Sequence, residues 1–595
     1  MTKVLFFAPH TGIWVHAFPE ALVAEALSQQ GEDIVYVTCG EVFRDQCVVM
    51  DASRIGWRSD SRERSEICRR CAASKRIVRK EFGFPGYDLG QVLQAEDQAD
   101  ADRLVDQVSR ENFQSLVVDG VPVGRFAAYE LLLRHKKLTL EFSEVEWEEY
   151  RISLRYALLA LFGTKRILDR EKPDRIVAYN ALYSVNRTVC MLGEQRGIPH
   201  YFLHAGGNLA YRLQTLMFGR EWTFRYVERL VEQWPTFRDR PCPPALMQKI
   251  TEHFLVLFSG ASAFAFSPSA TGGRRDLAHF FGINPEQRVL VATMSSYDER
   301  FAAEVVGALP TDYTLLFPRQ VDWIQALVEW ISGRPDLFLI IRVHPREFPD
   351  SRGGGKSEHA RLLEQIFAKL SSNARVNWPS DGVSIYDLAD IADVFLNAWS
   401  TAGKEMSLLG LPVVIYSSEL AAYPVELNYL GVTREHYFAQ IERALNDGWS
   451  LERARLAYRW LAVEYGCGVF DIGDGYSHRE HTTPSFGQRV VSRVLRSINP
   501  DFIQQQDCRR RPSALHAADE LTALIRGRHG TPLELPSRVQ ASAVDRDLEE
   551  RELRAQLGRI GRVLYGLQGP APTGKLAARL WQVSAEFTAS VSGAL

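Results

Sequence analysis

A histidine and an arginine directly follow an apolar segment in the second half of the chain. Residues 337–343 read LFLIIRV, and His344, Pro345 and Arg346 come next. Ligands of open α/β sheets bind beyond the carboxyl ends of the strands, and an imidazole and a guanidinium placed there can contact a phosphate. We therefore predict that His344 and Arg346 bind a phosphate group.

A second anion-binding pattern follows residues 394–397 (VFLN), where hydroxyl, small and acidic residues stand at the predicted start of a helix. A helix start offers unpaired backbone N–H groups and the positive end of the helix dipole, which favour an anion. A carboxylate one turn into the helix could accept hydrogen bonds from ribose hydroxyls, although a Ser-Thr pair is also a common helix cap. The predicted donor-binding residues of this group are Ser400, Thr401, Gly403 and Glu405.

The first half of the chain offers candidates for acid–base chemistry. His10 and His16 lie in the predicted loop after the apolar segment 4–8, and an imidazole titrates near neutrality, as a general base should. Asp119 ends another apolar segment and is the second candidate base; capping a turn or pairing with Arg125 is its alternative role. Two further residues at predicted strand ends, which we expect to line an acceptor site, are Asn180 and His204.

Four of the eight cysteines lie close together near the N-terminus. Cys68 and Cys71 have the C-x-x-C spacing of a zinc knuckle, and Cys39 and Cys47 could complete a tetrahedral set. Buried or free thiols are the alternative. No histidine or carboxylate cluster accompanies them, so we predict at most a structural zinc site and no metal in catalysis.

Two series of apolar segments separated by helical stretches position these residues. Uninterrupted apolar runs suit parallel strands that are covered on both faces. We predict an α/β fold with two Rossmann-like domains, residues 1–270 and 275–480, followed by a helical extension over 481–595. The predicted strands are 4–8, 33–38, 115–119, 175–179 and 200–203 in the first domain and 288–293, 313–317, 337–343, 394–397 and 412–416 in the second.

Composition is that of a globular enzyme. Of 595 residues, 46% are hydrophobic and 24% charged, and the net charge of −3 argues against a protein whose main task is nucleic-acid binding. The N-terminus lacks the long apolar core of a secretory signal, and the longest apolar stretch, 253–266, is shorter than the ~20 residues that span a bilayer. We expect a cytoplasmic protein, at most peripheral to the inner membrane.

The motifs together resemble a known family. RVHPRE followed by DLADIADVFLNAWSTAGKEMSLLGLPVV resembles the donor-binding half of GT-B glycosyltransferases that build bacterial surface polysaccharides such as capsule and O-antigen. The His-Pro pair is similar to that of the CMP-sugar transferases for Kdo and sialic acid, and teichoic-acid glycerophosphotransferases have a related arrangement. The resemblance implies two facing Rossmann domains, no metal requirement, and a donor nucleotide bound by His344, Ser400, Thr401 and Glu405.

Two more segments share this resemblance, TMSSYDER (293–300) and FPRQVDWIQALVEWI (317–331). They add Ser295, Ser296 and Arg319 to the predicted donor site, while exposure in a loop is the alternative for Arg319. The E-x7-E motif of retaining GT-B enzymes is missing, so the stereochemical outcome stays open.

We therefore predict a glycosyltransferase that moves a sugar from a nucleotide-sugar donor to a cell-surface or lipid-linked glycan, with His16 or Asp119 activating the acceptor. No nucleic acid and no required cofactor are expected. Three alternatives remain open: a sugar-nucleotide epimerase of GT-B-like fold, a CDP-polyol phosphotransferase and a non-catalytic assembly scaffold. The C-terminal helices, with the cluster Arg509–Arg511 and the leucine stripe from Leu548 to Leu564, could bind an assembly partner or anionic lipid.

Overall fold

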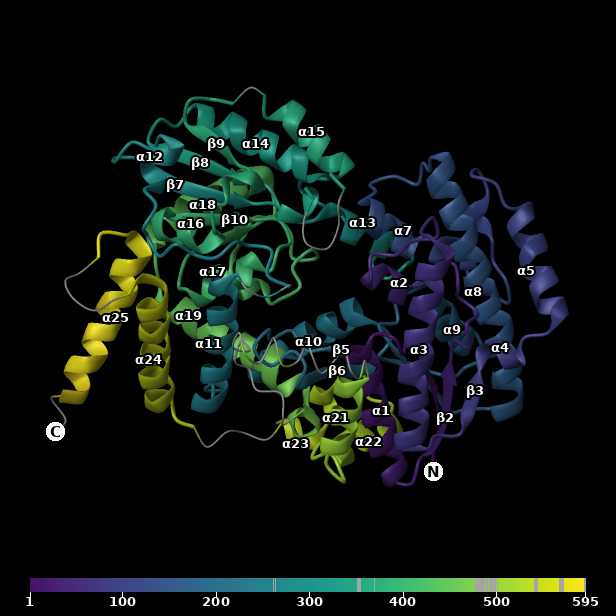
Figure 1. Cartoon of the computed structure of the whole chain (residues 1–595). Coiled ribbons are helices and arrows are strands. Elements are labelled where there is room, and N and C mark those ends of the chain that lie inside the picture. The colour runs from purple at the N-terminus through teal and green to yellow at the C-terminus, as the bar shows by residue number, and fades with distance from the viewer. Residues whose placement is uncertain are drawn as a thin grey trace.

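Two β-sheets form the centres of two lobes (Figure 1). The computed structural model describes residues 1–260, 262, 264–349, 355–368, 370–476, 487, 491, 499, 501–539, 544–566 and 572–592. Within these residues, the first sheet has seven strands in the order β13-β6-β5-β4-β1-β2-β3, and the second has six in the order β12-β11-β10-β7-β8-β9. The prediction of an α/β fold with two Rossmann-like halves is confirmed.

The first sheet is parallel except at one edge. β1 lies between β2 and β4, and its residues Val4 to Phe7 have no exposed surface. β6 runs antiparallel to β5, and β13 runs antiparallel to β6. Its strands are β1 (Lys3–Phe7), β2 (Asp33–Thr38), β3 (Gly86–Asp88), β4 (Arg175–Tyr179), β5 (His200–Ala205), β6 (Thr215–Arg220) and β13 (Phe470–Asp471).

The second sheet is parallel throughout the described residues. β7 lies between β8 and β10, so the loops that follow these three strands are neighbours at the carboxyl edge. Its strands are β7 (Arg288–Thr293), β8 (Leu337–Arg342), β9 (Ala374–Asn377), β10 (Val394–Asn397), β11 (Val413–Ile415) and β12 (Tyr429–Leu430).

Helices cover both sheets and form the C-terminal part of the chain. None of the helices in the described residues is both long and apolar enough to cross a bilayer. The helices of the first lobe are α1 (Trp14–Gln29), α2 (Val48–Ala52), α3 (Ser61–Phe82), α4 (Leu89–Val92), α5 (Ala95–Gln107), α6 (Val123–Phe126), α7 (Tyr129–His135), α8 (Glu144–Glu171), α9 (Ser184–Gln195), α10 (Thr223–Phe237) and α11 (Pro244–Ser259). The later helices are α12 (Leu277–Phe281), α13 (Tyr297–Val305), α14 (Gln320–Ser332), α15 (Glu358–Ile366), α16 (Ile385–Ile391), α17 (Ala402–Leu408), α18 (Arg434–Asp447), α19 (Leu451–Ala462), α21 (Phe502–Arg510), α22 (Ala518–Gly527), α23 (Pro536–Val539), α24 (Arg546–Tyr565) and α25 (Lys575–Ser592).

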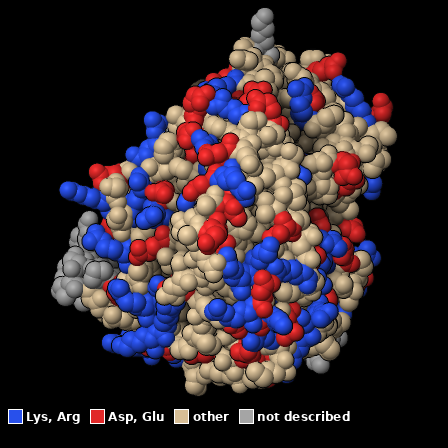
Figure 2. All heavy atoms as spheres, turned by 90° about the vertical axis from the view of Figure 1, so that its right-hand side faces the viewer, with Lys and Arg blue, Asp and Glu red and all other residues tan. Residues whose placement is uncertain are grey.

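The acidic run at the start of α8 has a structural role. Ser143 and Glu146 form a capping box, in which the Ser143 amide donates to Glu146 at 2.8 Å. Further along, arginines of α8 pair with aspartates of α5, as in Arg166 with Asp97 at 2.9 Å. These helices lie on the right in Figure 1, on the side shown in Figure 2, where basic and acidic side chains are interspersed over the surface.

Two predicted strands are absent. Where the strand 115–119 was predicted, a 3-10 turn over Phe113–Ser115 ends and a tight hairpin follows, in which Val118 and Val121 exchange two backbone hydrogen bonds of 2.9 Å. Asp119 and Gly120 form its turn with φ of 49° and 78°, since an Asp-Gly pair favours a two-residue turn with both φ positive. Residues 313–317 form no strand either; Phe317 is buried among aromatic rings at the end of a loop.

The predicted border of the second domain is wrong at its end. The second domain was expected to continue to residue 480, but β13 pairs with β6 of the first sheet. The chain therefore returns to the first lobe after α19. Residues 477–486, which contain the start of the predicted extension, lie outside the described residues.

The C-terminal helices pack on both lobes. α22 packs on α1, α24 on α11, and α25 on α24 and α16. Leu553, Leu557 and Ile560 of the predicted leucine stripe have no exposed surface, so these three residues face protein, whereas Leu548 at the start of the stripe is 36% exposed. Arg511 pairs with Glu25 of α1 at 3.2 Å.

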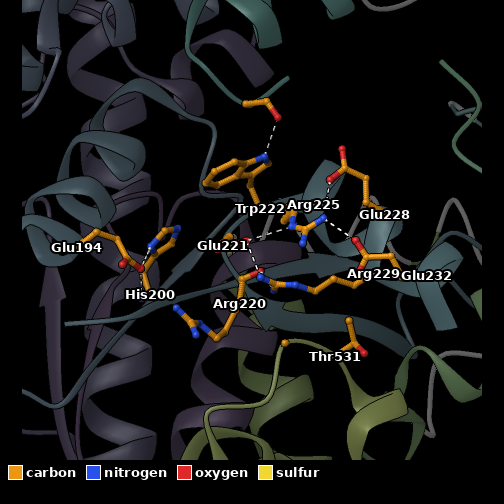
Figure 3. Close-up of polar contacts among 12 residues, drawn as sticks. Glu194, His200, Arg220, Glu221, Trp222, Arg225, Glu228, Arg229, Glu232 and Thr531 are labelled. Atoms are coloured by element: carbon orange, nitrogen blue, oxygen red, sulfur yellow. Dashed lines mark hydrogen bonds and ion pairs between the residues drawn. The ribbon is translucent and has the colours of Figure 1, made fainter. Parts of the chain in front are cut away.

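The carbonyl groups at the end of α13 connect the two lobes. Arg125 donates to the carbonyl of Val305 at 2.6 Å, and Arg187 donates to that of Val306 at 2.9 Å. The indole of Trp222, drawn in Figure 3, donates to the carbonyl of Ala308 at 2.8 Å. The end of a helix leaves its last carbonyl groups unpaired and carries partial negative charge. The two guanidinium groups donate hydrogen bonds to these carbonyls, and their positive charge is favourable at this end of the helix. These bonds fix the position of the second sheet relative to the first.

Candidate active site at the carboxyl edges of the two sheets

The loops after β7, β8 and β10 are tied together by hydrogen bonds. The amide of Trp399, after β10, donates to the hydroxyl of Ser295, after β7, at 3.1 Å. The amide of Tyr297 donates to the carboxylate of Glu347, after β8, at 3.3 Å. The residues predicted to bind the donor therefore share one edge of the second sheet.

His344 presents a defined hydrogen-bond donor at this edge. Its Nδ1 accepts the amide proton of Arg346 at 3.2 Å, and its ring lies 5.2 Å from the ring of Phe266. Burial lowers the pKa of His344 to about 4, so the ring is neutral near pH 7. Because Nδ1 accepts, the single ring proton is on Nε2, which has no partner among the described residues.

Arg346 contacts protein groups and not an open site. It is 9% exposed, pairs with Asp298 at 2.8 Å, and donates to the carbonyl of Leu133 in the first lobe at 3.2 Å. Ser296 donates to the same Asp298 at 2.6 Å. Arg319 is largely exposed and pairs with Asp322 one turn along α14 at 2.6 Å.

The residues around the start of α17 are also bonded within the protein. Thr401 and Tyr386 each donate to Glu405 at 2.9 Å, and burial raises the pKa of Glu405. Ser400 accepts the amide proton of Ala402 at 3.3 Å. These contacts are those of a helix cap and a buried carboxyl group.

Gly403 has a packing role that its sequence position does not reveal. A Cβ atom at this position would lie 1.9 Å from the hydroxyl of Tyr423 and 2.6 Å from the amide nitrogen of Asn397. Because Gly403 has no side chain, the ring of Tyr423 can pack directly against the start of α17, next to Asn397.

At the carboxyl edge of the first sheet, the buried His10 and the half-buried His16 keep unpaired ring nitrogens. His10 is 5% exposed, neither of its ring nitrogens has a partner, and its ring lies edge-on to Tyr183 at 5.6 Å. His16, in the first turn of α1, stacks on Tyr179 at 3.9 Å, and its Nδ1 is unpaired. Burial lowers the pKa of each to about 3, so both rings are neutral near pH 7.

The ends of β4 and β5 complete this edge. Asn180 follows β4 with φ of 54°, a conformation that asparagine tolerates better than most residues. His204 donates from Nδ1 to the carbonyl of Ala205 at 2.9 Å, and burial, followed by the charge of Arg212, lowers its pKa to about 4. The sequence analysis missed Arg212, whose guanidinium lies over the ring of Phe264 at 4.1 Å, because it stands in an irregular loop without a motif.

Asp119 lies away from this site, contrary to its prediction as a base. Its carboxylate pairs with Lys165 of α8 at 2.7 Å. A Cβ atom at Gly120 would lie about 3.0 Å from the side chain of Gln195, at the end of α9 that leads into the amino end of β5. Asp119 is therefore near the opposite edge of the sheet from His10 and His16.

The four N-terminal cysteines line one pocket of about 470 Å³ including its opening. Within the part of the chain that the structure describes, no group of three or more His, Cys, Asp or Glu side chains is arranged to hold a metal ion. Burial raises the pKa of Cys39 to about 12 and that of Cys68 to about 11. The structure therefore gives no support to the predicted structural zinc.

Comparisons with known proteins add little. No family model matches the sequence, and no curated protein matches it. Among solved structures, the chain is similar to a UDP-GlcNAc 2-epimerase from Neisseria meningitidis (11% identity, 80% of this chain and 99% of that one, TM-score 0.26). It is also similar to the β-Kdo 2,4 transferase KpsC from Thermosulfurimonas dismutans (16%, 50% and 80%, TM-score 0.32) and to the spinosyn rhamnosyltransferase SpnG (11%, 78% and 95%, TM-score 0.23). At such TM-scores the likeness carries no argument about activity.

Proposed function

We propose that this protein transfers a sugar from a nucleotide-sugar donor to an acceptor hydroxyl, with the donor at the second sheet and the acceptor at the first. The placement of the nucleotide-sugar at the second sheet is supported most by His344. Its neutral ring offers one fixed N–H hydrogen-bond donor at the carboxyl edge of this sheet. A phosphate oxygen is the acceptor that such a donor suits. Ser400, Thr401 and Glu405 lie at the same edge and would contact the nucleoside.

The acceptor side of the proposal rests on His10, His16, Asn180 and His204. The two histidines of the first loop have pKa values of about 3, far below the pH at which a general base is efficient. We therefore assign them hydrogen bonding to acceptor hydroxyls in preference to proton removal. A surface glycan or a lipid-linked glycan is the acceptor class we propose.

A thermal-shift panel with CMP, CDP, UDP and GDP tests the donor assignment. A ligand that binds the folded state alone raises the melting temperature with its concentration. We expect one nucleotide to give a saturable rise that the others do not match. A panel without any rise would contradict the proposal.

Incubation with the corresponding nucleotide-sugar and no acceptor separates transfer from epimerisation. A transferase leaves the sugar configuration unchanged, whereas an epimerase converts the donor into its isomer. Appearance of the isomer in the NMR spectrum would replace the proposal with the epimerase alternative.

A further inference from the structure

A second pocket, of about 370 Å³ including its opening, lies beside His10. We call it the acidic pocket because two carboxylates face it. Its lining residues are His10, Phe43, Gln46, Cys47, Val48, Asp51, Glu130, Arg134, Ser153, Tyr156, Ser184 and Val185.

Two groups of the acidic pocket have fewer partners than buried polar groups usually have. Both ring nitrogens of His10 are unpaired, although only 5% of the residue is exposed. Glu130 accepts the amide proton of Ser184 at 2.8 Å and has no ion-pair partner among the described residues. A neutral imidazole offers one donor and one acceptor, and a carboxylate accepts several hydrogen bonds. A ligand in the pocket would satisfy both groups.

The charge around the pocket disfavours an anion. Arg134 pairs with Asp51 and also with Glu149, which does not line the pocket. One guanidinium group therefore neutralises two carboxylates only in part. Glu130 adds a third acidic group. Burial raises the pKa of Glu130 to about 7 and that of Asp51 to about 6, the latter against the opposing charge of Arg134.

The acidic pocket adjoins the second lobe. Glu130 lies on α7, which packs against α13, the helix that follows β7. Three residues further along α7, the carbonyl of Leu133 accepts a hydrogen bond of 3.2 Å from Arg346, which stands two residues after His344. A group bound in the pocket is therefore near the edge where we place the donor.

We propose that the acidic pocket binds a hydroxyl-rich sugar ring of the acceptor that carries no negative charge, and that Glu130 takes the proton of its reacting hydroxyl. This inference rests on the proposed transferase function. The acceptor O–H bond breaks and its oxygen bonds to the anomeric carbon of the donor. The bond from that carbon to the phosphate oxygen breaks, its electron pair leaves with the nucleotide, and the proton moves to the Glu130 carboxylate and then to water.

Saturation-transfer NMR on the full chain tests the binding step. The probes are the methyl glycosides of glucose, galactose, mannose and N-acetylglucosamine, each beside its uronate where one exists. We expect at least one neutral glycoside to give a signal several-fold stronger than its uronate. We expect Ser153→Phe, which fills the pocket from α8, to abolish that signal. Equal signals for a neutral ring and its uronate, or no signal at all, would overturn the proposal.

Glu130→Gln tests the chemical step, because glutamine keeps the hydrogen bonds but cannot accept the proton. Using the nucleotide-sugar and the glycoside that bind, we expect turnover to fall by about 100-fold or more. Glycoside binding and the nucleotide thermal shift should both persist. The matched control is Glu96→Gln on the exposed face of α5, which should leave turnover unchanged. Wild-type turnover in Glu130→Gln would remove Glu130 as the proton acceptor.

The two proposals fail in different ways. If glycosides bind in the pocket and no nucleotide shifts the melting temperature, the acidic pocket stands and the donor assignment falls. If nucleotides bind and no neutral glycoside does, the donor assignment stands and the acidic pocket falls.

Discussion

The two sheet edges differ in how far the protein satisfies its own polar side chains. At the second edge, Arg346 and Glu405 are each bonded to two or more protein groups. At the first edge, His10 and His16 are mostly buried and keep unpaired ring nitrogens. An unpaired buried polar group costs about 1–3 kcal/mol, so a fold retains such groups where something else satisfies them.

This difference separates residues that hold the lobes together from residues that meet a ligand. The motif around His344 is rich in charge, yet the charge of Arg346 is neutralised by Asp298. In the separate segment 317–331, the charge of Arg319 is likewise neutralised by Asp322. The first edge has no such motif, and its histidines His10 and His16 keep unpaired ring nitrogens. Four substitutions sharpen this comparison.

Arg346→Ala should give the largest loss of stability. It leaves Asp298, which is 2% exposed, without its cation and removes the bond to Leu133 across the lobes. Breaking a buried ion pair from one side costs about 3–5 kcal/mol. Urea unfolding measures this loss, and Arg319→Ala, which breaks an exposed pair, should lose less than about 1 kcal/mol. A comparable loss in both variants would show that the second edge is not the more tightly bonded one.

Glu20→Gln should make the protein more resistant to alkali. Glu20 is 2% exposed on α1 and accepts the amide proton of Tyr179 at 3.1 Å; burial raises its pKa from 4.5 to about 8. A pKa raised by folding means that the stability contribution is complete below pH 4.5 and is lost as the pH rises through 8. Between about pH 6 and pH 9 the wild type should therefore lose roughly 2–3 kcal/mol that the variant keeps.

Melting temperatures of both proteins across that pH range check this expectation. The buried histidines act at the other end of the scale, because their pKa values of about 3 make stability fall as the pH drops below 6.5. Glu20→Gln should leave this acid limb unchanged below pH 4.5, where the contribution of Glu20 is complete. Parallel alkaline limbs in the two proteins would contradict the assignment of a buried, protonated Glu20.

Most of the fold could be predicted because its central strands are continuous apolar runs. Residues 33–38, 175–179 and 288–293 form strands at the bounds that their apolar runs indicated. The short edge strand β3, with the residues Gly86–Asp88, has no such run and depends on pairing with β2. Residues 115–119 were misread because their apolar side chains pack around a tight Asp-Gly turn, in which local turn geometry overrides strand propensity.

The site was less predictable because the hydrogen-bond and ion-pair partners of its side chains come from residues far away in the sequence. The sequence identified Arg346 but not its partners, Asp298 and Leu133, which come from another strand loop and another lobe. Glu130 has no motif; its environment arises only when α7 meets α9 and the loop after β1. Tyr183 was missed as well, although its position shortly after β4 placed it at the correct edge of the sheet.

His344→Ala tests whether the carboxyl edge of the second sheet provides a hydrogen-bond donor to a bound nucleotide. The variant loses the fixed Nε2–H donor, and one hydrogen bond to a charged phosphate oxygen is worth about 1.5–3 kcal/mol. We expect the affinity for the nucleotide found in the thermal-shift panel to fall by about 10-fold or more. Calorimetric titration measures the change, and the exposed His279→Ala serves as the control. Unchanged affinity in His344→Ala would leave the second edge with no supported ligand contact.

Asp119→Asn should have the smallest effect of the four. Its partner Lys165 is 42% exposed and Asp119 is 35% exposed at the side chain, so the pair is worth about 0–1 kcal/mol. Asparagine also tolerates the positive φ of 49° that this turn requires, which keeps the hairpin intact. We expect wild-type turnover and a melting temperature within about 2 °C of the wild type. A large loss of turnover with an intact fold would mean that catalysis extends to the far edge of the first sheet, and the division between the two carboxyl edges would then no longer describe the active site.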